Sequence, residues 1–197
     1  MPFATDIQKL RSRARKNIED GAVTASYELD RDAAVEALNG ALATELVCVL
    51  RYRRHHFMAS GIHSESVKAE FLVHAQEEQA HADLLAERIV QLGGEPNFNP
   101  EGLSARSHAE YVEGNTLAEM IREDLIAERI AIDSYREMIA FFGAKDSTTR
   151  TILEKILSDE EEHAEEMSSL LDNVGPAPSE PTANGTPSRK ATSPREG

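Results

Sequence analysis

The chain has 197 residues, of which 40% are hydrophobic, enough for one domain with a modest core and flanking segments. Its formal net charge of -14 disfavours nucleic acid as the main partner of the folded body and favours cations. It has no evident secretory signal or membrane-spanning stretch, and its single cysteine, Cys48, cannot form an internal disulfide, so a cytoplasmic protein is predicted.

Residues 1–30 are predicted to form an N-terminal arm that contains a short basic helix ending near Gly21. Its positive charges are Lys9, Arg11, Arg13, Arg15 and Lys16. The arm could dock on the bundle or on a neighbouring subunit. It could also contact DNA phosphates, although nearby acidic residues dilute its charge.

Four long segments have the periodicity of amphipathic helices. They cover about residues 32–60, 65–92, 116–142 and 148–172. Asp30 or Asp32 can cap the first segment, and Gly93 with Gly94 ends the second. The sequence therefore predicts an all-α domain over residues 31–173, followed by a disordered Pro/Ser/Thr-rich tail over residues 174–197.

A Glu-x-x-His motif occurs on two of these segments, as Glu78 with His81 and as Glu160 with His163. Residues three apart share one face of a helix, and here that face also carries the apolar residues. Burying a charged carboxylate is very unfavourable unless the group is paired or binds a metal. The two motifs therefore indicate a compensating charge inside the domain.

The two halves of the chain also repeat each other. An inward Glu is followed seven residues later by a Tyr in both, as Glu45 with Tyr52 and Glu128 with Tyr135. From Glu45 to Glu78 is 33 residues, and the corresponding step in the second half is 32. This repetition predicts one helical hairpin used twice, with all four carboxylates at the same height.

A connection of about residues 94–115 separates the two hairpins. It is unusually long for a compact domain, but about twenty extended residues can run the full length of a bundle. The predicted fold is therefore a four-helix bundle with one long crossover between its second and third helices.

Four carboxylates that converge in one layer require counter-charge, which two divalent cations supply. The two imidazoles add nitrogen donors, which favour iron, manganese or zinc over calcium or magnesium. A Glu-rich site with one His per metal is better suited to redox chemistry with O₂ or peroxide than to binding structural zinc, which prefers Cys and His ligands.

These segments resemble the ferritin-like superfamily, and bacterioferritin most. The similar motifs are ATELVCVLRY in the first helix, EQAHADLLAERIVQLGG in the second, DLIAE in the third and DEEEH in the fourth. The resemblance implies two iron ions per subunit, bridged by Glu78 and Glu160. Glu45 and His81 would then be terminal ligands of one iron, and Glu128 and His163 of the other. Tyr52 would stand beside them as an electron donor or supporting group.

Other residues near this site are given smaller roles. Tyr135 and Cys48 are expected to be ordinary core residues. His74 is expected to be a partly exposed helix histidine, with a metal ligand on an access path as the alternative. Haem-binding bacterioferritins place a Met where this chain has Gln79, so no haem is expected by that route.

The resemblance implies a ferroxidase that oxidises Fe(II) with O₂ or H₂O₂ and stores iron in a hollow homo-oligomer of about 12 or 24 subunits. The terminal extensions resemble the arms of Dps-type mini-ferritins, so a DNA-binding protein that removes peroxide and iron is one alternative. A di-iron or di-manganese peroxidase or catalase without a shell is the other.

Overall fold

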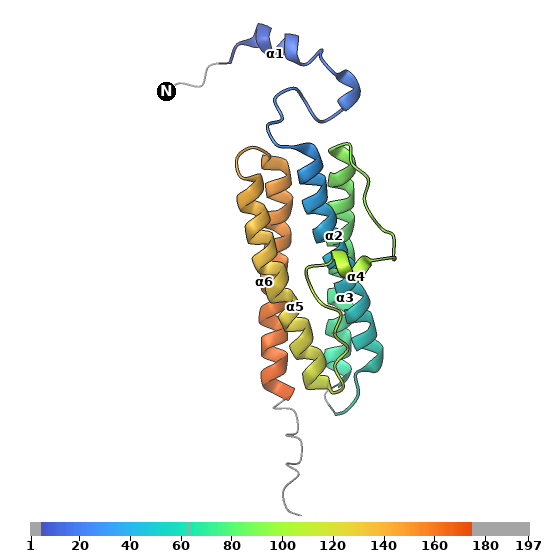
Figure 1. The fold of residues 1–197 in the computed structure, drawn as a ribbon. Coiled ribbons are helices and arrows are strands. Elements are labelled where there is room, and N and C mark those ends of the chain that lie inside the picture. The colour runs from blue at the N-terminus through green and yellow to red at the C-terminus, as the bar shows by residue number, and fades with distance from the viewer. Residues whose placement is uncertain (1–4, 63, 175–197) are drawn as a thin grey trace, which may run out of the picture.

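The structure of the protein is a computed structural model that describes residues 5–62 and 64–174. Its long helices are α2 (Arg31–Met58), α3 (Ser64–Gln91), α5 (Leu117–Phe142) and α6 (Ser147–Val174). No strand occurs within those described residues, which confirms the all-α prediction. Helices α2 and α3 form one antiparallel hairpin and α5 and α6 form a second, which packs beside the first (Figure 1).

The helix ends follow from local side-chain chemistry. The carboxylate of Asp30 accepts hydrogen bonds from the backbone of Asp32 and Ala33, so Asp30 is the cap of α2. Thr116 and Glu119 form a reciprocal capping box at the start of α5. Gly93 has a φ of +79° just after α3, a conformation that other residues rarely adopt.

Two hydrophobic clusters fill the bundle, one toward each end. The first is built around Leu38, Leu85, Ile89, Phe142, Leu153 and Ile156. The second is built around Tyr52, Phe71, Ile121 and Met167. The layer between these clusters holds the charged residues that the sequence places at equal height.

The crossover runs back along the length of the bundle from the end of α3 to the start of α5 (Figure 1). These two helices therefore run parallel, as predicted. It contains one turn of helix, α4 (Leu103–Arg106), which is too short to show periodicity in the sequence. Side chains of α2 hold it along its length. Asn39 bonds to the backbone of residues 95 and 97, Thr44 Oγ1 accepts from His108 N, and Arg51 donates to Glu110 O.

A buried ionic group supports the same segment from inside. Arg51 Nε lies 2.8 Å from Asp124 Oδ1, and His55 Nδ1 lies 2.8 Å from Asp124 Oδ2. All three side chains are at most 1% exposed. The other ring nitrogen of His55 bonds to Glu113 O, so α2, α5 and the crossover meet at this group.

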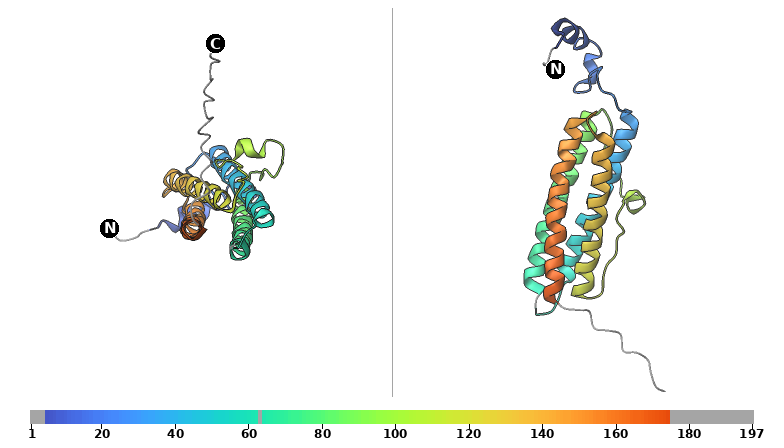
Figure 2. Two further views of the ribbon diagram at one scale, coloured as in Figure 1. Left: turned by 90° about the horizontal axis from the view of Figure 1, so that it is seen from below. Right: turned by 90° about the vertical axis from the view of Figure 1, so that its left-hand side faces the viewer.

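The N-terminal arm begins with a helix, α1 (Ile7–Arg13), that has no buried residue and projects beyond the end of the bundle (Figure 2). This helix is shorter than predicted, and a separate 3-10 turn, Ile18–Asp20, follows it. Among the described residues of the arm, Val23 is the first that enters the core. Apart from Val174, the tail predicted over residues 174–197 lies outside the described residues.

Helix α2 is long and apolar enough to pass a composition test for a membrane span, with a mean hydropathy of 1.5 in its most apolar window. Within that window, 56% is buried inside the bundle. The same window carries the buried carboxylate of Glu45, and the helix packs against α3, α5 and the crossover. The environment of α2 is therefore that of a bundle core helix.

Candidate metal centre

The structure brings all six predicted ligands into one buried layer, with one carboxylate from each helix and one imidazole from each of α3 and α6. They fall into two overlapping groups whose ligand atoms lie within 4.8 Å of one another. The groups are Glu45, Glu78, His81 and Glu160, and Glu78, Glu128, Glu160 and His163. Two adjacent metal positions that share two carboxylates fit this geometry.

The shared carboxylates each face both imidazoles. Glu78 Oε2 lies 3.4 Å from His81 Nδ1, and Glu78 Oε1 lies 3.4 Å from His163 Nδ1. Glu160 Oε1 lies 3.1 Å from His81 Nδ1, and Glu160 Oε2 lies 3.7 Å from His163 Nδ1. Each carboxylate therefore presents one oxygen to each position, which is the arrangement of a bridging ligand.

The remaining carboxylates belong to one position each. Glu45 Oε2 lies 3.4 Å from His81 Nδ1, and Glu128 Oε2 lies 4.0 Å from His163 Nδ1. The two halves of the centre are therefore related by the same internal repeat that the sequence shows.

The polar atoms of this layer lack the partners that buried groups need. Eight buried side-chain atoms of the six residues have no hydrogen bond. They are Glu45 Oε2, both oxygens of Glu78, His81 Nδ1, Glu128 Oε2, both oxygens of Glu160 and His163 Nδ1. Unpaired buried charges are very unfavourable, and two divalent cations would satisfy all eight atoms. The residues present therefore fit a dinuclear metal site.

The protonation of the metal-free centre reflects this crowding. Burial raises the pKa of Glu45 well above its usual value, and the charges of Glu160 and Glu78 add to the effect. Burial alone would lower the pKa of His163, but the carboxylates around its Nδ1, with Glu160 first, raise it to about 12. In the metal-free protein, protons thus supply part of the charge that a metal would bring.

Two acidic residues that sequence reasoning missed fix the orientation of the imidazoles. His81 Nε2 donates to Asp159 Oδ2 over 3.2 Å, and His163 Nε2 donates to Glu77 Oε2 over 3.0 Å. Each neutral ring therefore carries its lone pair on Nδ1, which faces the metal positions. Asp159 and Glu77 directly precede the Glu of the two Glu-x-x-His motifs, a repetition that could have identified them.

The two tyrosines support the ligands crosswise. Tyr52 donates a hydrogen bond to Glu128 Oε1, and Tyr135 donates one to Glu45 Oε1. Each hydroxyl thus leaves the other oxygen of its carboxylate free for a metal. The expectation that Tyr135 is an ordinary core aromatic is therefore incomplete, because its ring packs in the core but its hydroxyl holds a candidate ligand.

The structure corrects the expectation for His74, which is fully buried rather than partly exposed. Its Nδ1 lies 3.1 Å from Tyr52 Oη, its Nε2 lies 2.7 Å from Glu166 Oε2, and its ring stacks on His163. Cys48 is a buried core residue, as predicted, and burial raises the pKa of its thiol.

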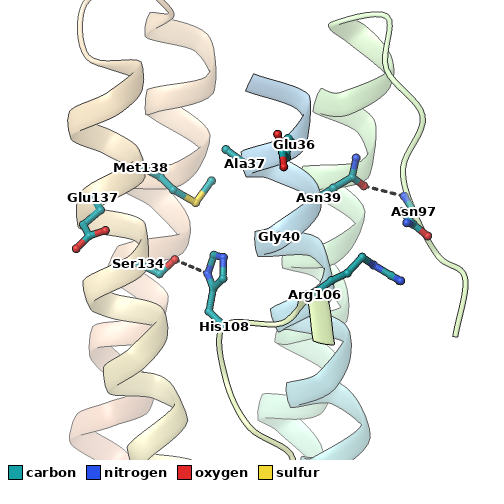
Figure 3. Close-up of a pocket in the computed structure, with 10 residues that line it drawn as sticks. All are labelled: Glu36, Ala37, Asn39, Gly40, Asn97, Arg106, His108, Ser134, Glu137 and Met138. Carbon is teal, nitrogen blue, oxygen red and sulfur yellow. Dashed lines mark hydrogen bonds between the residues drawn. The ribbon is translucent and has the colours of Figure 1, made fainter. Parts of the chain in front are cut away.

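A pocket of about 630 Å³ lies on another side of the bundle, between α2, α5 and the crossover (Figure 3). His108 closes one side through a 2.7 Å hydrogen bond between its Nδ1 and Ser134 Oγ, and Asn97 bonds to Asn39. None of the six candidate ligands lines this pocket. It is a surface feature of the crossover, separate from the metal centre.

Comparison with known proteins agrees with this geometry. The family model of the ferritin-like domain matches residues 35–175. The bacterioferritin of Desulfovibrio desulfuricans is 30% identical over 151 residues, covering 74% of this chain and 80% of that protein. The bacterioferritin of Mycobacterium leprae is 32% identical over 139 residues, covering 70% of this chain and 83% of that protein.

Solved structures that are similar to this chain also include bacterioferritins and related proteins. A dodecameric thioferritin, the bacterioferritin-related protein of Bacteroides fragilis, has a TM-score of 0.71 and 31% identity over 74% of this chain and 88% of that chain. The D. desulfuricans bacterioferritin, described with a diiron site, has a TM-score of 0.63 and 26% identity over 73% of this chain and 81% of that chain. The chain therefore belongs to the ferritin-like family. The relatives named here are bacterioferritins and a bacterioferritin-related protein.

Proposed function

We propose that the protein is a ferroxidase that takes up two Fe(II) ions as substrate and oxidises them with O₂ or H₂O₂. The observation that carries this proposal is the set of eight unpartnered donor atoms, arranged as two equivalent positions with two carboxylates between them. Two Fe(II) ions release one electron each, so the oxidant can accept two electrons together and no one-electron product is released.

The proposed roles follow the geometry of the centre. Glu78 and Glu160 bridge the two positions, and each remaining carboxylate shares one position with a histidine. Tyr52 holds Glu128 through its hydroxyl and is suited to supply an electron. The hydrophobic clusters on either side limit access of water to the layer.

We further propose that the oxidised iron is stored in a hollow homo-oligomer in the cytoplasm. Similarity to bacterioferritins and to a thioferritin that is dodecameric supports this assembly. The acidic net charge of -14 is suited to attract Fe(II).

The test removes both bridging carboxylates in the double variant E78A/E160A. We expect the variant to remain helical but to lose at least about 100-fold in the initial rate of Fe(II) oxidation, because both positions lose their shared ligands. Oxidation is followed by absorbance after mixing with O₂ or H₂O₂. E154A, on the exposed face of α6, is the control and should keep the wild-type rate. A wild-type rate in E78A/E160A would exclude this centre.

A second candidate function is protection of DNA by a Dps-like protein, and the projecting arm favours it. Helix α1 has no buried residue and carries Lys9, Arg11 and Arg13 away from the acidic bundle. This function predicts DNA binding that weakens steeply with salt and disappears when residues 1–20 are deleted. Unchanged binding after this deletion would reject a role for the arm.

A further inference from the structure

A second cluster of metal-ligating side chains lies beside the dinuclear centre, between α3 and α6. One ligand atom from each of Glu70, His74 and Glu166 lies within 4.8 Å of the others. His74 is fully buried, whereas the side chains of Glu70 and Glu166 are 34% and 42% exposed. The cluster therefore connects the interior of the bundle with its surface.

Hydrogen bonding determines which nitrogen of His74 faces outward with a lone pair. The hydroxyl proton of Tyr52 is donated to Glu128, so the Tyr52 oxygen accepts from Nδ1–H of His74. In the neutral ring, Nε2 then carries the lone pair. That lone pair faces Glu166 Oε2 at 2.7 Å and Glu70 Oε1 at 3.5 Å. Three acceptors that converge in this way require a cation between them, either a proton or a metal ion.

The cluster also contacts the dinuclear centre. The His74 ring stacks on His163 with 4.1 Å between the ring centroids. His74 forms a further group of potential ligands with Glu128 and His163, and Glu128 Oε2 and His163 Nδ1 have no hydrogen bond. A cation at the outer cluster would therefore lie next to the metal position that Glu128 and His163 define.

Cavities join this cluster to solvent. A cavity of about 120 Å³ has Glu70, Glu166 and His163 in its walls. A groove of about 420 Å³ shares Glu70, Glu162 and Glu166 with it and adds Glu165 at the surface. The small cavity therefore lies between the surface groove and His163 of the dinuclear centre.

Within the part of the chain that the structure describes, the internal repeat places this arrangement beside one of the two metal positions. The Glu-x-x-His motifs are offset by 82 residues, so Ile152 and Ile156 occupy the places of Glu70 and His74 in the second hairpin. Ile156 is fully buried in the hydrophobic core. The polar residues Glu70 and His74 are therefore present in the first hairpin and replaced by apolar residues in the second. They lie on the side of the centre that contains His163.

We propose that Glu70, His74 and Glu166 form a third divalent-cation site, from which Fe(II) passes to the position between Glu128 and His163. One imidazole and two carboxylates suit Fe(II), Co(II), Mn(II) or Zn(II). The exposure of both carboxylates favours a site that exchanges its ion rather than one that retains it. This inference rests on the proposed ferroxidase function, because it supplies that centre with substrate.

The test is an anaerobic Co(II) titration of the full-length protein, followed by the absorbance of bound Co(II). We expect three ions per wild-type chain and two in E70Q/E166Q. The control E162Q/E165Q removes the same charge from the same groove but keeps the three ligands, so it should bind three. E78A/E160A should lose the dinuclear sites and keep the outer one, which separates failure of this inference from failure of the ferroxidase proposal.

A kinetic measurement tests the transfer of Fe(II). At limiting Fe(II), we expect oxidation by E70Q/E166Q to be about tenfold slower than wild type, with the difference narrowing as Fe(II) rises. E162Q/E165Q should follow wild type. Equal Co(II) binding by wild type and E70Q/E166Q would overturn the third site. Equal slowing of Fe(II) oxidation in E70Q/E166Q and E162Q/E165Q would overturn the transfer role. General attraction of Fe(II) by the negative charge of the groove would then explain the effect.

Discussion

At the scale of single residues, the two tyrosines show how an aromatic side chain supports a candidate metal ligand. We expect Y52F to weaken metal binding at the position of Glu128, and Y135F at the position of Glu45, each by about 10–100-fold. Anaerobic Co(II) titration measures this affinity. Y111F, at an exposed tyrosine in the crossover, is the control. Affinities equal to wild type in both variants would show that the hydroxyls do not support the ligands.

The protonation of the centre predicts how the metal-free protein responds to pH. Burial raises the pKa of Glu45 and Glu128, whereas nearby carboxylates raise that of His81 and His163 against the effect of burial. Hydrogen bonds from both imidazoles instead lower the pKa of Glu78, although burial opposes them. On balance, the folded centre binds more protons than the unfolded chain. The free energy of unfolding of the metal-free protein therefore falls as pH rises.

For His163, the stabilisation is complete below its ordinary pKa of 6.5 and declines as pH rises toward about 12. We therefore expect the melting temperature of EDTA-treated protein to fall between about pH 6 and pH 9, by about 2–4 °C for each kcal/mol lost. Metal-loaded protein should change less, because its ligands have already released these protons. A melting temperature that rises over this range without metal would contradict the proposed proton uptake.

At the scale of secondary-structure elements, the buried group around Asp124 holds α2, α5 and the crossover together. The variant D124A leaves the guanidinium of Arg51 buried without its carboxylate, so we expect the free energy of unfolding to fall by about 3–5 kcal/mol. Urea unfolding followed by circular dichroism measures the loss. E161A breaks an exposed pair with Arg136 and should cost less than about 1 kcal/mol. Similar losses in both variants would show that the buried group does not anchor these elements.

The same scale shows what the sequence could and could not predict. Helix periodicity and the spacing of the two Glu-x-x-His motifs were enough to bring six side chains to one layer. The crosswise contacts of Tyr52 and Tyr135 depend on how the hairpins rotate against each other, which neither hairpin specifies alone. The burial of His74 depends on Glu166 of the facing helix, and the single turn of α4 is too short to leave a pattern.

At the scale of the whole molecule, the proposals differ in the assembly that they require. Twelve chains of 21.7 kDa would form a particle of about 260 kDa, and twenty-four would form one of about 520 kDa. We expect a hollow particle of one of these masses by size exclusion with light scattering and by electron microscopy. A dimer or hexamer would instead favour a peroxidase or catalase without a shell.

The crosswise support of the ligands has a consequence for how this chain can change. Each hairpin supplies the hydroxyl that positions a carboxylate of the opposite hairpin. A substitution that moves one tyrosine therefore alters chemistry in the half of the molecule where it does not reside. Although the halves look like a duplicated unit, neither is free to diverge independently of the other.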